Sequence, residues 1–212
     1  MKAGSNTLFL RLEKTNSLLH AIGILFGIVC LPVLLKKAGK FDNVSIIAGA
    51  AIYACCFLMV FIASTIYHGV QQPQLKKALK IADHFSIYFL IAGTYTPIVI
   101  IFVHNSFGIT LLVILWSLTL FGIFFKLFYT GKYEILSTLL YVIMGWILFA
   151  NNKAFFAIMP YNIIVLLAVG GVLYSIGVIF YLWESFTYHH VIWHIFVLAA
   201  SICHYSAVLL SV

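Results

Sequence analysis

Residues 44–67 read VSIIAGAAIYACCFLMVFIASTIY, a continuous apolar stretch without a charged side chain that ends just before His68. At 1.5 Å per residue, a helix of this length crosses the roughly 30 Å hydrocarbon core of a bilayer. Backbone groups in hydrocarbon must find their hydrogen bonds within the segment, so a helix is expected rather than a strand. We therefore predict a transmembrane helix here.

Similar apolar stretches recur on both sides of this one. The predicted spans are residues 17–35, 44–67, 84–104, 108–128, 134–150, 161–181 and 190–211. Of all residues 64% are apolar and only 8% are charged, whereas a soluble domain carries about a quarter charged residues. The spans leave no room for a separate soluble domain. We predict an all-α integral membrane protein, a single domain over residues 1–212 built as a seven-transmembrane helix bundle.

The basic residues lie in the short segments between spans and indicate the orientation of the bundle. With seven spans, eight of the basic residues share the side of the N-terminus: Lys2, Arg11, Lys14, Lys76, Lys77, Lys80, Lys126 and Lys132. Four lie on the other side: Lys36, Lys37, Lys40 and Lys153. The positive-inside rule then predicts a cytoplasmic N-terminus and an outer C-terminus. We expect the plasma (inner) membrane of a bacterium.

The net charge of +7 does not indicate a nucleic-acid partner. A protein that binds nucleic acid collects its basic side chains on one face or groove. Here they are distributed over the ends of apolar segments, where they act as topology signals. We expect membrane lipid as the partner and no nucleic acid.

The predicted topology brings most of the histidines to one face of the membrane. Six of the eight lie at cytoplasmic ends of spans: His20, His68, His84, His189, His190 and His194. His104 is expected on the outer side and His204 in the middle of the membrane. Ionisable side chains inside a bilayer are costly, so they usually mark function.

The spacing of these residues points to a metal. His190 and His194 are four residues apart and share one helix face, as do Ser64 and His68. Two imidazoles from one helix and a third from another form the open His₃ pattern of catalytic zinc sites. Asp83 could then hold or deprotonate a water at the metal. The alternative is that these histidines only hydrogen-bond neighbouring helices.

Three sequence blocks resemble a known family. The first is Glu13-Lys14-Thr15-Asn16-Ser17, which leads to His20. The second is Ser64-Thr65-Ile66-Tyr67-His68, followed by Asp83-His84-Phe85-Ser86 and by Ile91-Ala92-Gly93-Thr94-Tyr95-Thr96-Pro97. The third is His190-Val191-Ile192-Trp193-His194, with His204 beyond. In this order the blocks resemble the haemolysin III branch of the progestin and adipoQ receptor (adiponectin-receptor-like) superfamily.

The resemblance implies a seven-helix fold with a zinc (Zn²⁺) site on the inner side. It implies that His68, His190 and His194 bind the metal, that Asp83 is linked to it through water, and that Ser64 lies near it. The superfamily is also similar to alkaline ceramidases, which implies hydrolysis of lipid amides. Whether His20, His84 or His189 joins the metal site stays open.

The function we expect is therefore a zinc-dependent hydrolase of a membrane lipid amide. Asp83 would be the general base, and Ser64 would orient the water or the developing oxyanion. One alternative is a haemolysin-type membrane-damaging protein, although a self-contained pore needs polar residues along several spans and here they collect at one end. The other alternative is a receptor or sensor whose zinc is structural.

Overall fold

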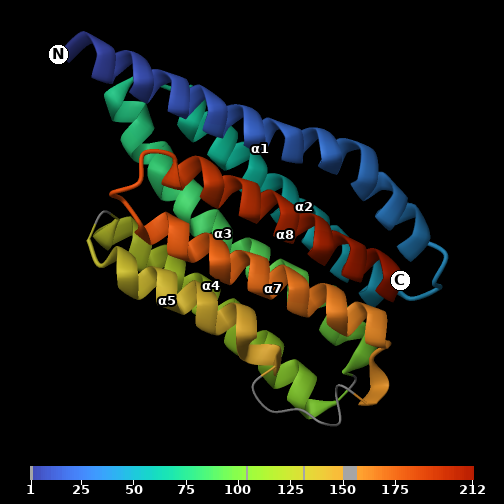
Figure 1. The fold of residues 1–212 in the computed structure, drawn as a ribbon. Helices are drawn as coiled ribbons and strands as arrows, with labels where there is room; N and C mark the ends of the chain where they lie inside the picture. The colour runs from blue at the N-terminus through green and yellow to red at the C-terminus, as the bar shows by residue number, and fades with distance from the viewer. Residues whose placement is uncertain (1, 104, 131, 150–156) are drawn as a thin grey trace.

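The computed structural model describes residues 2–103, 105–130, 132–149 and 157–212, with side chains from residue 7 onward. Its helices are α1 (Lys2–Ala38), α2 (Val44–Gly69), α3 (Pro73–Phe102), α4 (Ser106–Tyr129), α5 (Glu134–Trp146) with the 3₁₀ turn η1 (Ile147–Phe149), α7 (Tyr161–Leu182) and α8 (His189–Ser211) (Figure 1). Within these ranges every regular element is helical. His104, Lys153 and the side chain of Lys2, which entered the predictions, lie outside the described residues.

The helices run side by side in one bundle, and the start of α1 and the end of α8 lie at opposite ends of it (Figure 1). Contacts join α1 to α2, α2 to α3, α3 to α5, α5 to α7, α7 to α8 and α8 back to α1, which closes a ring. Helix α3 also contacts α8 and α4. Its apolar window is 61% buried, more than that of any other spanning helix described. Helix α3 is therefore the centre of the bundle.

Among the described residues, six helices are long and apolar enough to cross a membrane: Thr7–Ala38 within α1, α2, α3, α4, α7 and α8. The segment Glu134–Phe149, formed by α5 and η1, is apolar but shorter. These helices confirm an all-helical integral membrane protein, and each of the six overlaps one of the predicted spans. The predicted span over residues 134–150 corresponds to the shorter segment Glu134–Phe149.

Two helix boundaries were predicted wrongly. Helix α3 begins at Pro73, so most of the segment between the predicted spans 44–67 and 84–104 is helical, and α1 extends far ahead of residue 17. The error has a physical cause, because hydropathy marks the part of a helix in hydrocarbon and not the turns beyond it. Proline at the first helical position starts α3 without losing a hydrogen bond.

Local sequence signals account for other helix ends and contacts. The side chain of Asn43 accepts hydrogen bonds from the first turn of α2, and that of Asn105 does so for α4. Gly23 packs against the Phe61 ring of α2, where a Cβ would lie 2.1 Å from the nearest ring atom. Gly27 packs against the side chain of Leu58. These contacts agree with the packing role that small residues have between membrane helices.

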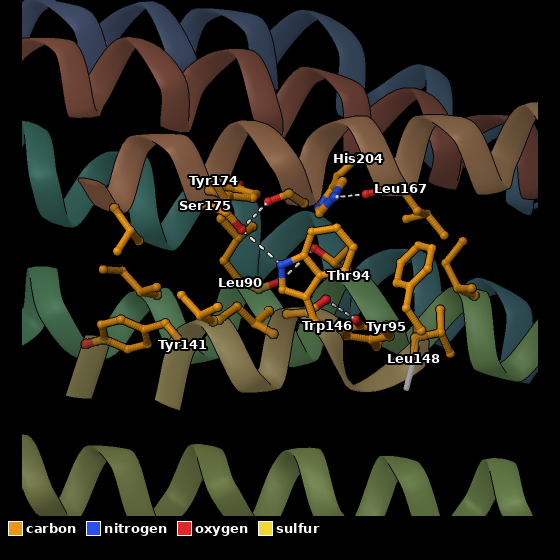
Figure 2. A pocket seen from close by; sticks show the side chains of 18 of the residues that line it. Leu90, Thr94, Tyr95, Tyr141, Trp146, Leu148, Leu167, Tyr174, Ser175 and His204 are labelled. Atoms are coloured by element: carbon orange, nitrogen blue, oxygen red, sulfur yellow. Dashed lines mark hydrogen bonds between the residues drawn. The ribbon is translucent and has the colours of Figure 1, made fainter. Parts of the chain in front are cut away.

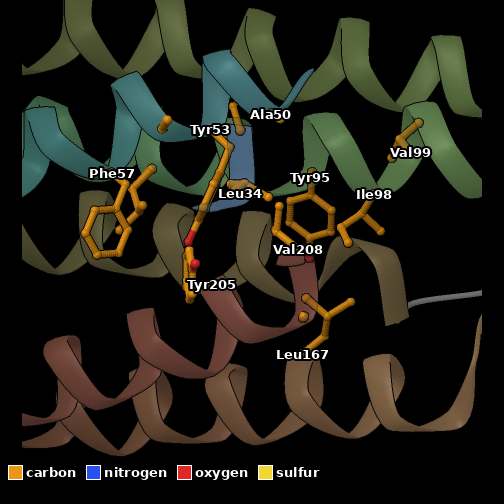
Figure 3. Close-up of a cluster of buried hydrophobic side chains, with 14 of the residues drawn as sticks. Leu34, Ala50, Tyr53, Phe57, Tyr95, Ile98, Val99, Leu167, Tyr205 and Val208 are labelled. Atoms are coloured by element: carbon orange, nitrogen blue, oxygen red, sulfur yellow. The ribbon is translucent and has the colours of Figure 1, made fainter. Parts of the chain in front are cut away.

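The half of the bundle that contains the C-terminal ends of α1 and α8 holds a cluster of buried apolar side chains (Figure 3). Leu34 of α1, Phe57 of α2 and Val208 of α8 are fully buried there. The Tyr205 hydroxyl donates a 2.7 Å hydrogen bond to the carbonyl of Cys30, so even this polar group is satisfied. We call this region the apolar half.

Candidate metal centre

His68 at the end of α2 and His190 and His194 at the start of α8 lie together. One ring nitrogen from each falls within 4.8 Å of the other two, in the part of the chain that the structure describes. His68 and His194 are buried and His190 is partly buried. The Nε2 atoms of His68 and His194 are 3.1 Å apart. The three imidazoles predicted from spacing and resemblance therefore converge on one point.

The outward nitrogen of His68 has a carboxylate partner. Nδ1 of His68 lies 3.2 Å from Oε1 of Glu13 on α1. The other oxygen of Glu13 binds Nζ of Lys76, which also donates to the carbonyls of Tyr67 and Val70 at 3.1 Å each. Glu13 is thus held by a lysine that is itself anchored to the end of α2.

The outward nitrogen of His194 has an imidazole partner. Nδ1 of His194 lies 2.6 Å from Nε2 of His20, and the two rings meet edge to face. His20 is only 3% exposed, and its own Nδ1 is buried without a hydrogen-bond partner among the described residues. His20 is therefore not one of the three converging ligands but lies directly behind one of them.

Helix α1 presents a buried polar stripe to this centre. Glu13, Asn16 and His20 are spaced three and four residues apart, so they share one face of the helix. Their exposed fractions are 8%, 2% and 3%. The sequence block that contains them was recognised, but Glu13 was assigned no role. The spacing of three polar residues at i, i+3 and i+7, which places them on one helix face leading into the first predicted span, was the signal that could have identified the stripe.

The donor set fits a zinc ion. Two nitrogen ligands at Zn–N distances of about 2.0–2.1 Å and a tetrahedral angle lie about 3.3 Å apart, close to the distance between the two Nε2 atoms. If Nδ1–H of His68 donates to Glu13, Nε2 keeps a free lone pair that faces His194. A carboxylate behind a ligating histidine is the usual outer partner in such sites.

Asp83 and Ser64 line one cavity with His190 and His194. Both side chains are buried, and the Ser64 hydroxyl lies close enough to the Asp83 carboxylate to interact with it. Asp83 is not in the group whose ligand atoms lie within 4.8 Å of one another. The structure therefore brings Asp83 and Ser64 beside the three imidazoles, and the Asp83 carboxylate is set back from them.

The remaining histidines have other surroundings. Nδ1 of His84 lies 3.9 Å from Oε1 of Glu134, whose other oxygen binds the buried Lys126 at 2.7 Å. His189 points its Nδ1 at the carbonyl of Phe180. Lys126, counted above as a topology signal, is only 1% exposed and is an internal ion-pair partner.

A second cavity continues from the first toward the apolar half (Figure 2). The two cavities share the lining residues Ile87, Leu90, Tyr141, Tyr174 and Trp193. The second encloses about 800 Å³, counting its open mouth. Its polar groups are already paired: Trp146 donates to Ser175 at 2.9 Å, and Nε2 of His204 lies 3.2 Å from the Leu167 carbonyl. The cavity is therefore apolar in character.

Comparison with known proteins gives a consistent picture. The family described as "Haemolysin-III related" matches residues 10–205. Hemolysin-3 of Bacillus cereus is 38% identical over 203 residues, 96% of this chain and 93% of the relative. The Hemolysin-3 homolog of Bacillus subtilis (strain 168) is 40% identical over 197 residues, 93% of this chain and 92% of the relative. Monocyte to macrophage differentiation factor of Homo sapiens is 27% identical over 165 residues, 75% of this chain and 68% of the relative. No solved structure matches the chain significantly.

These relatives confirm the family resemblance inferred from the three sequence blocks. The human relative extends the similarity to the broader receptor superfamily. Together with the six apolar helices, the Bacillus relatives support the expected location in the plasma membrane of a bacterium. The similarity to alkaline ceramidases stays a prediction.

Proposed function

The chain belongs to the haemolysin-III-related family, and from that premise we propose that it is a zinc-dependent hydrolase of membrane lipid amides. His68, His190 and His194 are the proposed ligands, and Asp83 and Ser64 the proposed catalytic residues. The observation that carries the proposal is the convergence of three imidazoles beside a cavity that holds the buried Asp83 carboxylate and the Ser64 hydroxyl.

Three protein ligands leave a fourth position for water or substrate, which is the pattern of catalytic rather than structural zinc. Zinc bound there would supply Lewis acidity toward a water and a substrate carbonyl. Asp83 accepts a proton from the attacking water while the water oxygen adds to the amide carbonyl carbon. Asp83 then gives this proton to the amide nitrogen as the C–N bond breaks. Ser64 donates a hydrogen bond that orients the water or the developing oxyanion.

The neighbouring cavity supports a lipid substrate. Its lining is mostly aliphatic and aromatic, and it meets the Asp83 cavity at five shared residues. A lipid whose polar group lies at the imidazoles could place an acyl chain between α3, α5, α7 and α8 (Figure 2). The amide class rests on the similarity to alkaline ceramidases.

The experiment compares two variants in detergent-purified protein given ceramides of several chain lengths. His194→Ala should lose both zinc and hydrolysis. Asp83→Asn should keep most of the zinc but lower hydrolysis by about 10²–10⁴-fold, because an amide cannot accept the proton. If Asp83→Asn loses zinc as fully as His194→Ala does, the site has four protein ligands. Such a closed site would favour a receptor or sensor with structural zinc.

We also propose that α5 and η1 complete seven spans with the N-terminus in the cytoplasm. His68 ends α2 and lies beside His190 at the start of α8, so the chain between them crosses the membrane an even number of times. Helices α3, α4 and α7 supply three crossings, and Glu134–Phe149 supplies the fourth. Its length of roughly 25 Å requires local thinning of the bilayer.

The orientation rests on the eight-to-four distribution of basic residues. Reporter fusions at the two ends of the chain test it. We expect a cytoplasmic signal from the N-terminal fusion and an outer signal from the C-terminal one. Two signals from the same side would rule out seven spans.

A membrane-damaging activity is the second candidate, favoured by the name of the Bacillus cereus relative, Hemolysin-3. The buried carboxylates, Lys126 and the converging histidines gather at one end of the bundle, and the cavity that continues from them is apolar. Dye release from liposomes tests this candidate. Release that persists in His194→Ala would separate lysis from the metal centre, whereas release lost in Asp83→Asn would make it a consequence of lipid hydrolysis.

A further inference from the structure

We propose that α1 is part of the metal centre, with Glu13 and His20 as positioning residues that determine which ring nitrogen of His68 and His194 faces the metal. The inference rests on the proposed zinc site and deepens it. Each of these two ligands has its outward nitrogen in contact with a residue of α1, while its other nitrogen faces the triad. The same helix therefore supports both ligands from behind.

Glu13 supports His68. An ionised carboxylate only accepts hydrogen bonds, so Nδ1 of His68 must carry the proton toward it. Nε2 then presents its lone pair to the metal. Lys76 holds the second carboxylate oxygen of Glu13 and is fixed to two carbonyls at the end of α2. The acceptor is consequently held in place rather than free to rotate away.

His20 supports His194 in the same way. When Nε2 of His194 binds zinc, its remaining proton is on Nδ1 and must be donated to Nε2 of His20. His20 then carries its own proton on Nδ1, the atom that has no hydrogen-bond partner in the part of the chain described. Without metal, the opposite arrangement is available, because His194 can donate from Nε2 to His68. Zinc binding would thus select one tautomer of both rings.

A purely structural role explains these residues less well. A carboxylate and an imidazole buried in a membrane helix are costly compared with apolar side chains. Helix α1 already has another polar anchor at this level, because Ser17 donates a 2.9 Å hydrogen bond to the Thr65 carbonyl of α2. The Ser17 hydroxyl thus bonds to backbone rather than to an imidazole, so this residue provides a matched control.

The experiment measures zinc affinity by competition with a chelator, alongside the melting temperature of the metal-free protein. The variants are Glu13→Ala and His20→Leu, with Glu13→Gln and His20→Gln as conservative replacements that keep an acceptor oxygen, and Ser17→Ala as the control. We expect Glu13→Ala and His20→Leu each to weaken zinc binding by about 10–100-fold. The two Gln variants should recover most of this loss, and Ser17→Ala should bind zinc like wild type.

Two outcomes would overturn the inference alone. One is wild-type zinc affinity in both Glu13→Ala and His20→Leu. The other is a loss of affinity in all variants, Ser17→Ala and the Gln variants included, that follows their melting temperatures, since that would show only weakened docking of α1. If wild-type protein itself binds no zinc, the proposed function fails and the inference fails with it.

Discussion

The two ends of the bundle are held together in different ways. At the histidine end, buried polar side chains of α1, α2 and α8 contact one another through ring nitrogens and a carboxylate, and Lys76 of α3 binds that carboxylate. In the apolar half, the same helices are held by side chains such as Leu34, Phe57 and Val208 (Figure 3). Because lipid offers no hydrophobic driving force between helices, close packing must stabilise that half.

This difference indicates a division of roles along each helix. Helix α1 carries Glu13 and His20 in its N-terminal half and Leu34 near its end, so one helix takes part in both regions. Changes in its N-terminal half should alter metal binding more than stability. Changes at its end should do the opposite.

We expect acid to produce the largest difference between the histidine end and the apolar half of the bundle. Zinc ligation needs neutral imidazoles, so protons compete with the metal at the histidine end. Zinc affinity should be highest near neutral pH and should fall as the pH is lowered from about 7.5 to about 4, because a ligand that takes up a proton loses the lone pair that binds the metal. Chelator competition across this range measures it, and an unchanged affinity would contradict imidazole ligation.

Leu34→Ala should lower the stability of the apolar half without changing zinc binding at the histidine end. Leu34 is fully buried, so its truncation leaves a cavity and should lower the free energy of unfolding by about 2–5 kcal/mol. Zinc affinity measured below the melting temperature should stay at the wild-type value. A parallel fall in zinc affinity would show that the two regions are not separable.

Gly23→Ala tests how far packing and metal binding are coupled where the apolar half meets the histidine end. The added Cβ would overlap the fully buried Phe61 ring, at a cost of about 1–3 kcal/mol. That ring also lies 5.2 Å from the His20 ring, measured between centroids. We therefore expect both a lower melting temperature and weaker zinc binding. Gly145→Ala is the matched control, because a Cβ there meets nothing within 4 Å.

Lys76→Met should have the smallest effect. The substitution removes the cation that holds Glu13 but leaves the contact between Glu13 and His68. We expect zinc affinity to fall by less than the roughly tenfold lower limit for loss of a direct outer partner. A loss as large as that of Glu13→Ala would mean that Lys76, and not the carboxylate alone, fixes the orientation of His68.

Much of the fold could be predicted because hydrocarbon imposes a simple rule on sequence. The predicted span 44–67 corresponds to α2, and 190–211 corresponds to α8 with a one-residue difference at its start. The starts of α1 and α3 were missed because these turns are helical but polar, so hydropathy does not mark them. Helix α3 begins with a proline, and Lys76 in its first turn pairs with Glu13 of α1.

The site was predictable only in part. The i, i+4 spacing and the family resemblance identified the three converging imidazoles, and the structure brings them together. The partners behind them could not be read from spacing, because Glu13 is 55 residues from His68 and His20 is 174 residues from His194. Such pairs are set by how α1 packs against α2 and α8, which local sequence does not encode.

The most direct test of the metal centre is the zinc content of protein purified in detergent without chelators. The wild-type chain should hold about one zinc ion, because three imidazoles converge on one point. His194→Ala should hold almost none, since it removes one ligand and leaves only two. Wild-type protein without zinc, or a His194→Ala variant with the wild-type content, would contradict a zinc site formed by His68, His190 and His194.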